Sequence, residues 1–280
     1  MNIGVVQSLR RDTDLDAAFA RMRSMDIYSC QLVCWDRQVF HTPGAAEWVL
    51  EKLNQYGITL TAFWCGWEGR RVWNFYDGQV TLGLVPVDTR YERLKMLMEG
   101  SDFAKKLGAK YLATHVGYIP ENPLDPNYHG VINACKTIAD HCAKNGQVFL
   151  FETGQETPVT LRRAMNDIEN SVGKGTVGVN LDPANLILYG KGNPVDALDV
   201  FGEYVFGIHG KDGMYPTDGY SLGKETPLGA GKVNYPAFIR KLKEIGYAGD
   251  ITIEREISGD QQTKDILAGK ALLERLIAEP

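Results

Sequence analysis

Short apolar runs alternate with helical periodicity along the whole chain. Runs typical of buried strands occur at 2–6, 28–35, 58–65, 110–115, 148–154, 177–182, 205–209 and 250–257. Apolar spacing, cap residues and terminal glycines predict helices at 15–25, 42–57, 88–108, 157–170, 194–204, 234–246 and 261–278, and a further helix ending at 143. Strands that alternate with helices imply a parallel sheet, and eight such units predict an α/β protein with a closed (β/α)8 TIM barrel.

Side-chain alternation along the later strands gathers polar residues on one face, because residues two apart on a strand point the same way. In VGVNLD (177–182), Asp182 and Asn180 share one face, and valines and leucine share the other. His209 in VFGIH (205–209) and the pair Thr252 and Glu254 in ITIE (251–254) repeat the pattern. We therefore expect these polar residues to face the barrel axis and the branched apolar ones to face the helices.

The barrel is expected to fill residues 1–280 as one domain, since no linker or shift in composition interrupts the pattern. Two segments lack a clear period. The first, 66–87, follows a strand, carries four aromatic residues and has the length of a functional loop, so we expect it to close over a substrate. The second, 210–233, is rich in glycine and irregular.

The start of the second helix also has a local signal. Residues 42 and 43 (Thr-Pro) are expected to be its N-cap and first turn.

Composition narrows the classes of partner. The chain is 44% hydrophobic and 23% charged, as in ordinary globular proteins, and its net charge of −5 argues against nucleic acid or an anionic membrane as the main partner. Its apolar runs are shorter than the roughly 18 residues of a membrane span, and no signal peptide is evident. The five cysteines include no CxxC pair, which indicates reduced thiols in a cytoplasmic protein.

Four consecutive strands each end in a ligand-type side chain: Glu152, Asp182, His209 and Glu254. Any one of them alone has a simple structural reading as a capping, ion-paired or hydrogen-bonded residue. Together they place three carboxylates at one barrel mouth, where active sites of this fold lie, and the carboxylates would repel each other without a cation. The oxygen-rich set predicts a Mn²⁺ or Mg²⁺ site, and a purely structural charge network is the alternative.

At these strand ends the chain resembles a known family. The segments FLFETG, NLDPAN, GIHGKD and TIERE, with PLGAGKVNYPAF at 227–238, are similar to the xylose-isomerase-like TIM-barrel superfamily of sugar (phosphate) isomerases and epimerases. The resemblance implies a metal-dependent isomerase or epimerase of small sugars or sugar phosphates, active in carbohydrate metabolism. In its ketose 3-epimerases, the positions matching Glu152, Asp182, His209 and Glu254 bind Mn²⁺, and the two glutamates exchange the substrate proton through a metal-stabilised enediolate.

The resemblance also implies a divalent metal cofactor, Mn²⁺ first, with Mg²⁺, Co²⁺ or Zn²⁺ as alternatives, and a homodimer or homotetramer. Two positions depart from the epimerase pattern. Asn185 stands where the epimerases carry a substrate-contacting histidine, and the arginine that they carry past the metal histidine has no counterpart in GKDGMYP. Either Lys211 or Arg255 replaces that arginine, or the substrate differs.

Further residues near strand ends are candidates for substrate contact. His115 ends a strand as a histidine of the superfamily's DNA-repair branch does, and here we favour a contact with substrate over a structural hydrogen bond. Asn185 and Lys211 are candidates by position, with a local Lys211–Asp212 ion pair as the alternative. Trp35 and Trp64 suit the apolar face of a sugar ring or packing under the long loop. The pair Arg70–Arg71 suits a phosphate or is simply exposed.

Three other functions stay open. A metal-dependent lyase, of the inosose dehydratase or carbon–glycosidic bond-cleaving type, also begins by removing a proton beside a carbonyl or phenol. A phosphodiesterase or AP endonuclease would need two or three metal ions, which five histidines, Asn185 and the negative net charge disfavour. A sugar-binding barrel without catalysis would lack the metal.

Overall fold

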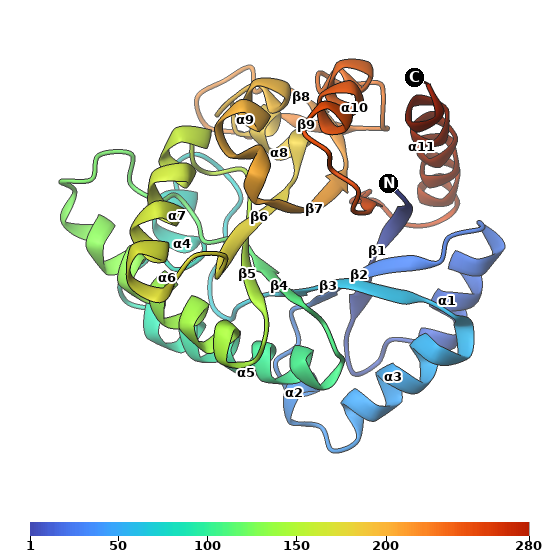
Figure 1. Cartoon of the computed structure of the whole chain (residues 1–280), viewed down its shortest axis with the longest axis horizontal. Helices are drawn as coiled ribbons and strands as arrows, with labels where there is room; N and C mark the ends of the chain where they lie inside the picture. The colour runs from blue at the N-terminus through green and yellow to red at the C-terminus, as the bar shows by residue number, and fades with distance from the viewer. Residues whose placement is uncertain (280) are drawn as a thin grey trace.

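Eight parallel strands close into a barrel at the centre of the molecule, and helices surround it (Figure 1). The computed structural model describes residues 1–279. The barrel strands lie side by side in chain order, and the last one pairs with the first, with Ile3 opposite Ile251. They are β1 (Ile3–Leu9), β2 (Ser29–Cys34), β3 (Thr59–Cys65), β4 (Tyr111–Thr114), β5 (Val148–Glu152), β6 (Val177–Leu181), β7 (Val205–Gly210) and β10 (Ile251–Ile253). The predicted TIM barrel is confirmed.

One long helix follows each barrel strand, as the sequence pattern predicts. These are α1 (Leu15–Ser24), α3 (Ala45–Tyr56), α5 (Arg90–Lys106), α6 (Pro126–Lys144), α7 (Pro158–Val172), α9 (Pro194–Phe201), α10 (Tyr235–Glu244) and α11 (Asp260–Ala278). Shorter helices lie in the connections: α2 (Gln38–His41), α4 (Gly78–Thr81), α8 (Pro183–Leu188) and the 3-10 turn η1 (Gly202–Tyr204). No helix within residues 1–279 is long and apolar enough to cross a bilayer.

Strand alternation separates an outer core from the barrel interior. Val177, Val179 and Leu181 of β6 belong to the large apolar core that the helices cover. A small separate apolar cluster, with Trp64 and Leu150 among its members, forms from the opposite faces of β3, β4 and β5. The remaining interior is polar, as the next subsection describes, so the expected division of faces holds.

The start of the second helix differs from the prediction. Thr42 does not cap α3, because it ends the short helix α2 and its hydroxyl donates to the carbonyl oxygen of Gln38 at 2.8 Å. Instead Gly44 is the N-cap, with φ of +78°, and α3 begins at Ala45. A glycine tolerates this left-handed conformation, which turns the chain between two successive helices.

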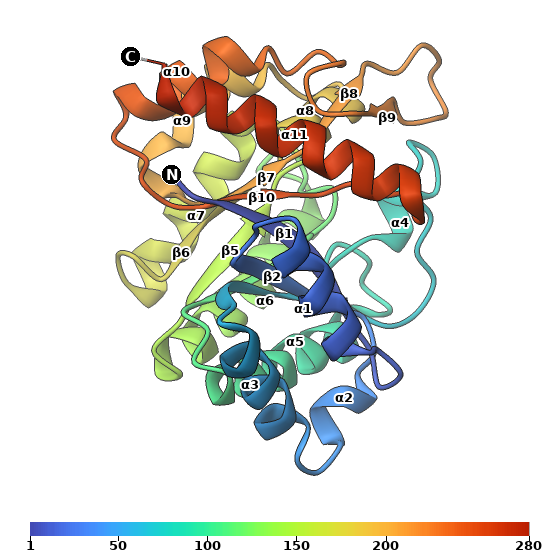
Figure 2. The same ribbon diagram turned by 90° about the vertical axis from the view of Figure 1, so that its right-hand side faces the viewer.

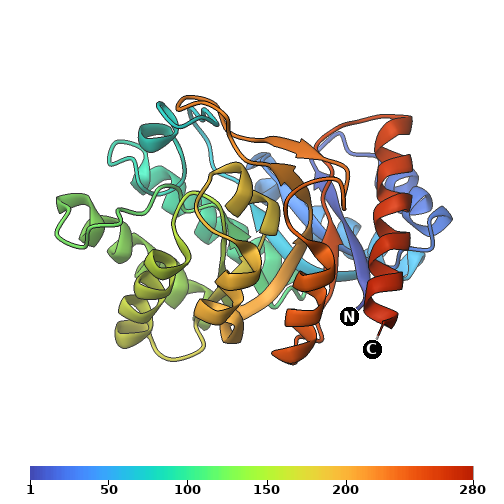
Figure 3. The same ribbon diagram turned by 90° about the horizontal axis from the view of Figure 1, so that it is seen from above.

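Two connections gather at one end of the barrel. The loop that contains α4 and the segment 210–233 lie on the side opposite the two chain termini, as Figures 2 and 3 both show. The segment 210–233 is more regular than expected, since β8 (Asp212–Met214) and β9 (Lys224–Thr226) form an antiparallel pair. Both connections follow the carboxyl ends of strands, where active sites of TIM barrels lie.

Candidate active site

Four neighbouring strands deliver the four predicted metal ligands to one place. Glu152 is the last residue of β5 and His209 lies in β7, whereas Asp182 and Glu254 directly follow β6 and β10. One ligand atom from each residue lies within 4.8 Å of the others. Asp182 is also the N-cap of α8, where its Oδ1 accepts from the backbone of Asn185 at 2.9 Å, so the local helix start holds the carboxylate in place.

The imidazole of His209 lies close to all three carboxylates of this cluster. Its Nδ1 lies 3.3 Å from a carboxylate oxygen of Glu152, 3.3 Å from one of Glu254 and 3.7 Å from one of Asp182. His209, Glu152 and Asp182 are almost fully buried, whereas the Glu254 side chain keeps 18% of its surface exposed. Glu254 is therefore the ligand nearest to an incoming molecule.

The electrostatics keep both glutamates ionised. Burial opposes charge on Glu152, but His115 and His209 outweigh it and lower the pKa of this carboxyl group. Burial also opposes charge on Glu254, and Lys211 and His209 hold its pKa well below the ordinary range. A carboxylate held ionised by its surroundings is ready to bind a cation or to accept a proton.

Lys211 lies against the cluster from the side of β8. Its Nζ lies 2.9 Å from Glu254, 2.6 Å from Glu256 and 3.5 Å from Asp182, although the residue is only 3% exposed. Burial disfavours the ammonium, but these three carboxylates outweigh it and raise the pKa of Lys211. The Lys211–Asp212 ion pair, the alternative to substrate contact by Lys211, does not form, because Asp212 accepts from the backbone amides of the loop 229–233 and of Gly213 instead.

Two amides beneath the cluster orient His209. Its Nε2 lies 2.9 Å from Oε1 of Gln31, and Gln31 donates through Nε2 to Oδ1 of Asn180 at 2.9 Å. Nε2 also lies 3.1 Å from Nδ2 of Asn180, so the two amides hold the ring with Nδ1 facing the carboxylates. When Nδ1 binds a cation, Nε2 carries the proton, which Oε1 of Gln31 can accept. All three side chains are buried inside the barrel.

This set of atoms fits a divalent cation. Oδ2 of Asp182 and Nδ1 of His209 are buried and make no hydrogen bond within the described residues. A buried polar atom without a partner costs free energy, and a bound cation would supply the missing partner for both atoms. Three carboxylates and one imidazole are donors that suit a hard or borderline divalent metal, with an open side for substrate. The residues that would hold it are Glu152, Asp182, His209 and Glu254.

A cavity of about 440 Å³ opens above the cluster. Its walls include two of the four predicted metal ligands and five predicted substrate contacts, and Asp182 and His209 lie beneath them. The seven are Trp35, Trp64, His115, Glu152, Asn185, Lys211 and Glu254. The volume is in the range of small-molecule sites.

Several predicted substrate contacts also touch Glu152. Trp64 donates to it through Nε1, Asn185 Nδ2 lies 3.3 Å from its Oε1, and His115 Nε2 lies 3.4 Å from the same oxygen. Trp35 packs on Trp64 with ring centroids 5.0 Å apart. The indoles therefore wall the cavity and one of them also fixes the carboxylate.

The cavity has further lining residues. One is Arg71, from the pair Arg70–Arg71 that the sequence suggested for a phosphate, and the others are Arg10, Val33, Trp73, Leu188, Tyr189, Leu222 and Glu256. Arg10 directly follows β1, but the strand was predicted to end at residue 6, so the strand-end rule did not reach it. Gln31 had a weaker signal, a single polar residue with an apolar run after it in a buried strand. Arg70 is not at the site, because it pairs with Asp77 at 2.9 Å.

Comparisons with known proteins agree with this fold. A family model described as "Xylose isomerase-like TIM barrel" matches residues 19–276. A xylose isomerase domain protein from Planctomyces limnophilus superposes with a TM-score of 0.85 at 32% identity, covering 98% of this chain and 95% of that one. A D-tagatose 3-epimerase-like protein superposes with a TM-score of 0.72 at 19% identity, covering 99% and 97%.

Two more distant relatives complete the comparison. A probable 3-DHS dehydratase from Bacillus anthracis superposes with a TM-score of 0.68 at 14% identity, covering 98% of this chain and 99% of that one, and therefore shares the fold. An uncharacterized protein of Methanocaldococcus jannaschii is 27% identical over 189 residues, 62% of this chain. The match spans 60% of the length of that curated relative. The family model spans nearly the whole barrel, and the chain belongs to the xylose isomerase-like TIM barrel family.

Proposed function

We propose that this protein is a divalent-metal-dependent enzyme that moves a proton at the carbon beside the carbonyl of a small carbohydrate, as an epimerase or isomerase. The observation that carries the proposal is the position of Glu152 and Glu254. Both carboxylates line the cavity, and both lie 3.3 Å from His209 Nδ1, yet they come from strands separated in the barrel by β6 and β7. A substrate seated there has a carboxylate within reach from two directions.

A cation held by Glu152, Asp182, His209 and Glu254 would supply a Lewis acid that polarises the carbonyl and acidifies the neighbouring C–H bond. One glutamate removes that proton and the other returns a proton to the carbon, which inverts its configuration when the two act from opposite faces. His115 and Asn185 contact Glu152 and lie on the cavity wall, where they can hold substrate hydroxyls. Trp35 and Trp64 provide an apolar wall for the sugar ring.

The test is turnover of a panel of ketoses, sugar phosphates and inososes in D₂O with added Mn²⁺. Proton transfer through the two glutamates should place solvent deuterium at the reacting carbon, whereas a hydride shift would retain the original hydrogen. E152Q and E254Q should each lose at least about 10²-fold in kcat, the scale of a positioned general base. Product without solvent deuterium, or a glutamine variant of full activity, would contradict the proposal.

A lyase is the second candidate, because it shares the first proton removal and because a dehydratase is among the structures with this fold. Asn185, which stands where the epimerases carry a substrate-contacting histidine, also contacts Glu152 directly. In that case an unsaturated product would form and the leaving group would depart instead of a proton returning. The same panel, followed by mass spectrometry for loss of water, separates the two reactions.

A further inference from the structure

Two arginines of the cavity wall have no acidic partner within the described residues. Arg10 directly follows β1, and Arg71 lies in the loop after β3. Both line the 440 Å³ cavity, and both also line a neighbouring surface hollow, whose other walls are Arg11, Asp12, Trp35 and Asp36. Neither guanidinium forms an ion pair with any carboxylate of residues 1–279, whereas Arg37 pairs with Glu99 and Arg255 pairs with Asp265.

The arginine next to each of them in the sequence gives the contrast. Arg11 binds Asp36 at 2.9 Å, and Arg70 binds Asp77 at 2.9 Å. These two charges are therefore already neutralised. Arg10 and Arg71 keep an unpaired positive charge at the entrance of the cavity. This local positive charge contrasts with the net charge of −5 of the whole protein.

A stack of aromatic rings connects Arg71 to the candidate catalytic centre. Its guanidinium lies 4.3 Å from the centre of the Trp35 ring, and Trp35 packs on Trp64, which donates to Glu152. Stacking on an indole fixes the plane of the guanidinium and leaves its N–H groups free at the edge. The two indole rings of Trp35 and Trp64 therefore lie between Arg71 and the carboxylate of Glu152.

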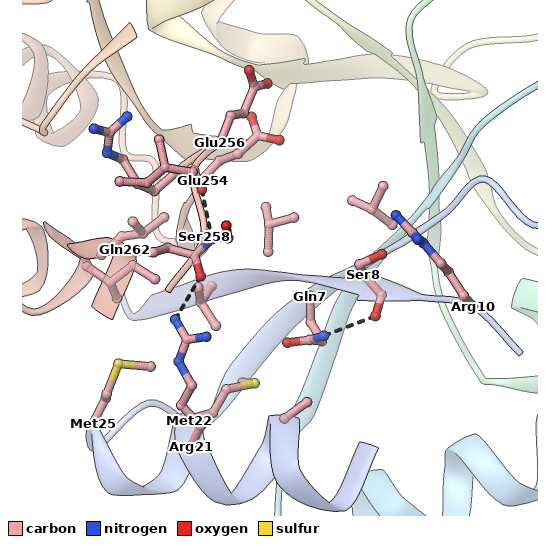
Figure 4. Close-up of a pocket in the computed structure, with 18 of the residues that line it drawn as sticks. Gln7, Ser8, Arg10, Arg21, Met22, Met25, Glu254, Glu256, Ser258 and Gln262 are labelled. Atoms are coloured by element: carbon pink, nitrogen blue, oxygen red, sulfur yellow. Dashed lines mark hydrogen bonds between the residues drawn. The ribbon is translucent and has the colours of Figure 1, made fainter. Parts of the chain in front are cut away.

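Arg10 lines the same cavity as Arg71, but it comes from the end of β1 and not from the loop after β3. In Figure 4 it stands at the end of β1, across a second hollow of about 590 Å³ from Glu254 and Glu256. That hollow continues the cavity, since Arg10, Val33, Trp35, Glu254 and Glu256 line both. No dashed line reaches the Arg10 guanidinium in the figure, whereas Arg21 binds Gln262 at 2.8 Å.

We infer that Arg10 and Arg71 bind an anionic substituent of the substrate, so that the enzyme acts on a sugar phosphate or a sugar acid in preference to a neutral sugar. The inference rests on the proposed function for the reacting end of the substrate. The planar guanidinium matches the paired oxygens of a phosphate or carboxylate, and two of them around Trp35 would hold the charged end at the rim. The cavity below would receive the carbon that reacts.

Binding of inorganic phosphate tests the anion site apart from catalysis. Titration calorimetry would compare the wild type with the R10Q/R71Q double variant and with the matched control R11Q/R70Q, all carrying the same measured metal content so that phosphate on the metal cancels. The wild type and the control should bind phosphate alike, and R10Q/R71Q should bind it at least tenfold more weakly. Equal affinity of all three proteins, or a loss in the control as large as in R10Q/R71Q, would overturn the inference. Thermal melting checks that each variant is folded.

Kinetics then identify the source of the charge. A ketose phosphate, a hexuronate and the matching neutral ketose would be compared in kcat/KM for the same three proteins. A charged substrate should be preferred at least tenfold by the wild type and the control, and the preference should disappear in R10Q/R71Q, mainly through KM. Preference for the neutral ketose, unchanged by R10Q/R71Q, would refute the anion site and leave the proposed proton transfer standing. Arginine-dependent phosphate binding without solvent deuterium in any product would refute the proton transfer instead.

Discussion

At the scale of single residues, the hydrogen bond from His209 Nε2 to Gln31 has the clearest consequence. It holds the ring from the side opposite to Nδ1, which faces the carboxylates, and partners of this kind orient metal-binding histidines. Q31L should therefore weaken Mn²⁺ binding about 10- to 100-fold, measured by titration calorimetry. Q31E keeps an acceptor for Nε2–H and should restore affinity to within a few-fold. If Q31L binds metal as the wild type does, Gln31 has no orienting role.

Glu156, in the turn between β5 and α7, makes a prediction about pH. It is 3% exposed, and burial raises its pKa to about 8. Above the ordinary pKa near 4.3, the unfolded chain releases this proton while the folded protein keeps it, so stability falls as pH rises from about 4.5 to 8. E156Q removes this loss, and its stability relative to the wild type should grow by roughly 2–4 kcal/mol between pH 5 and pH 9.

Urea unfolding at pH 5, 7 and 9 measures this difference. The exposed residue Glu47, on α3, supplies the control for replacing a carboxylate with an amide on the surface, as E47Q. A constant difference for E156Q would show that Glu156 is ionised in the folded protein throughout this range.

At the scale of elements, the loop between β3 and α5 is held by one buried side chain. Arg93 of α5 is 2% exposed and donates to the carbonyl oxygens of Glu68, Arg70, Thr81 and Gly83 at 2.8–3.1 Å. Its guanidinium also stacks over Trp67 at 4.3 Å. The part of the loop that carries Arg71 and Trp73 therefore extends from a fixed base. Whether it closes over substrate stays a prediction, to be tested by turnover after shortening.

Removal of this anchor should loosen the loop. R93M leaves four carbonyl groups without their donor, two of them on the buried residues Thr81 and Gly83, and should lower the free energy of unfolding by about 2–4 kcal/mol. Limited proteolysis should then cut within 66–87 faster than in the wild type. K95M, on the exposed side of the same helix, is the matched control and should change neither measurement. Unaltered cleavage in R93M would show that other contacts hold the loop.

At the scale of the whole molecule, the cluster ties four strands of the barrel together, so a bound cation should stabilise the entire fold. A ligand at 100 times its Kd adds about 2.7 kcal/mol, or roughly 5–10 °C in Tm for a domain of this size. Calorimetric melting with Mn²⁺ and then with excess chelator should show that difference. D182A should show no shift, and an equal shift in D182A would place the metal elsewhere.

The sequence alone was sufficient for the barrel and for the four strand ends. Strand and helix periods are local properties, and a closed parallel sheet brings the carboxyl ends of all strands to one rim, so Glu152, Asp182, His209 and Glu254 had to meet there. The interior face of β6 and β7 could be assigned by alternation for the same reason. Local patterns misplaced the start of α3, because Thr42 was already engaged in the helix before it.

Only the tertiary structure decided which charges remain free. Arg10, Arg11, Arg70 and Arg71 look alike in the sequence, and their roles separate only when Asp36 and Asp77 fold against two of them. The partner of His209 was likewise hidden, since Gln31 lies 178 residues away and meets it only when the barrel closes. Ion pairs and hydrogen bonds depend on distances between strands that are remote in sequence, and no local period encodes those distances.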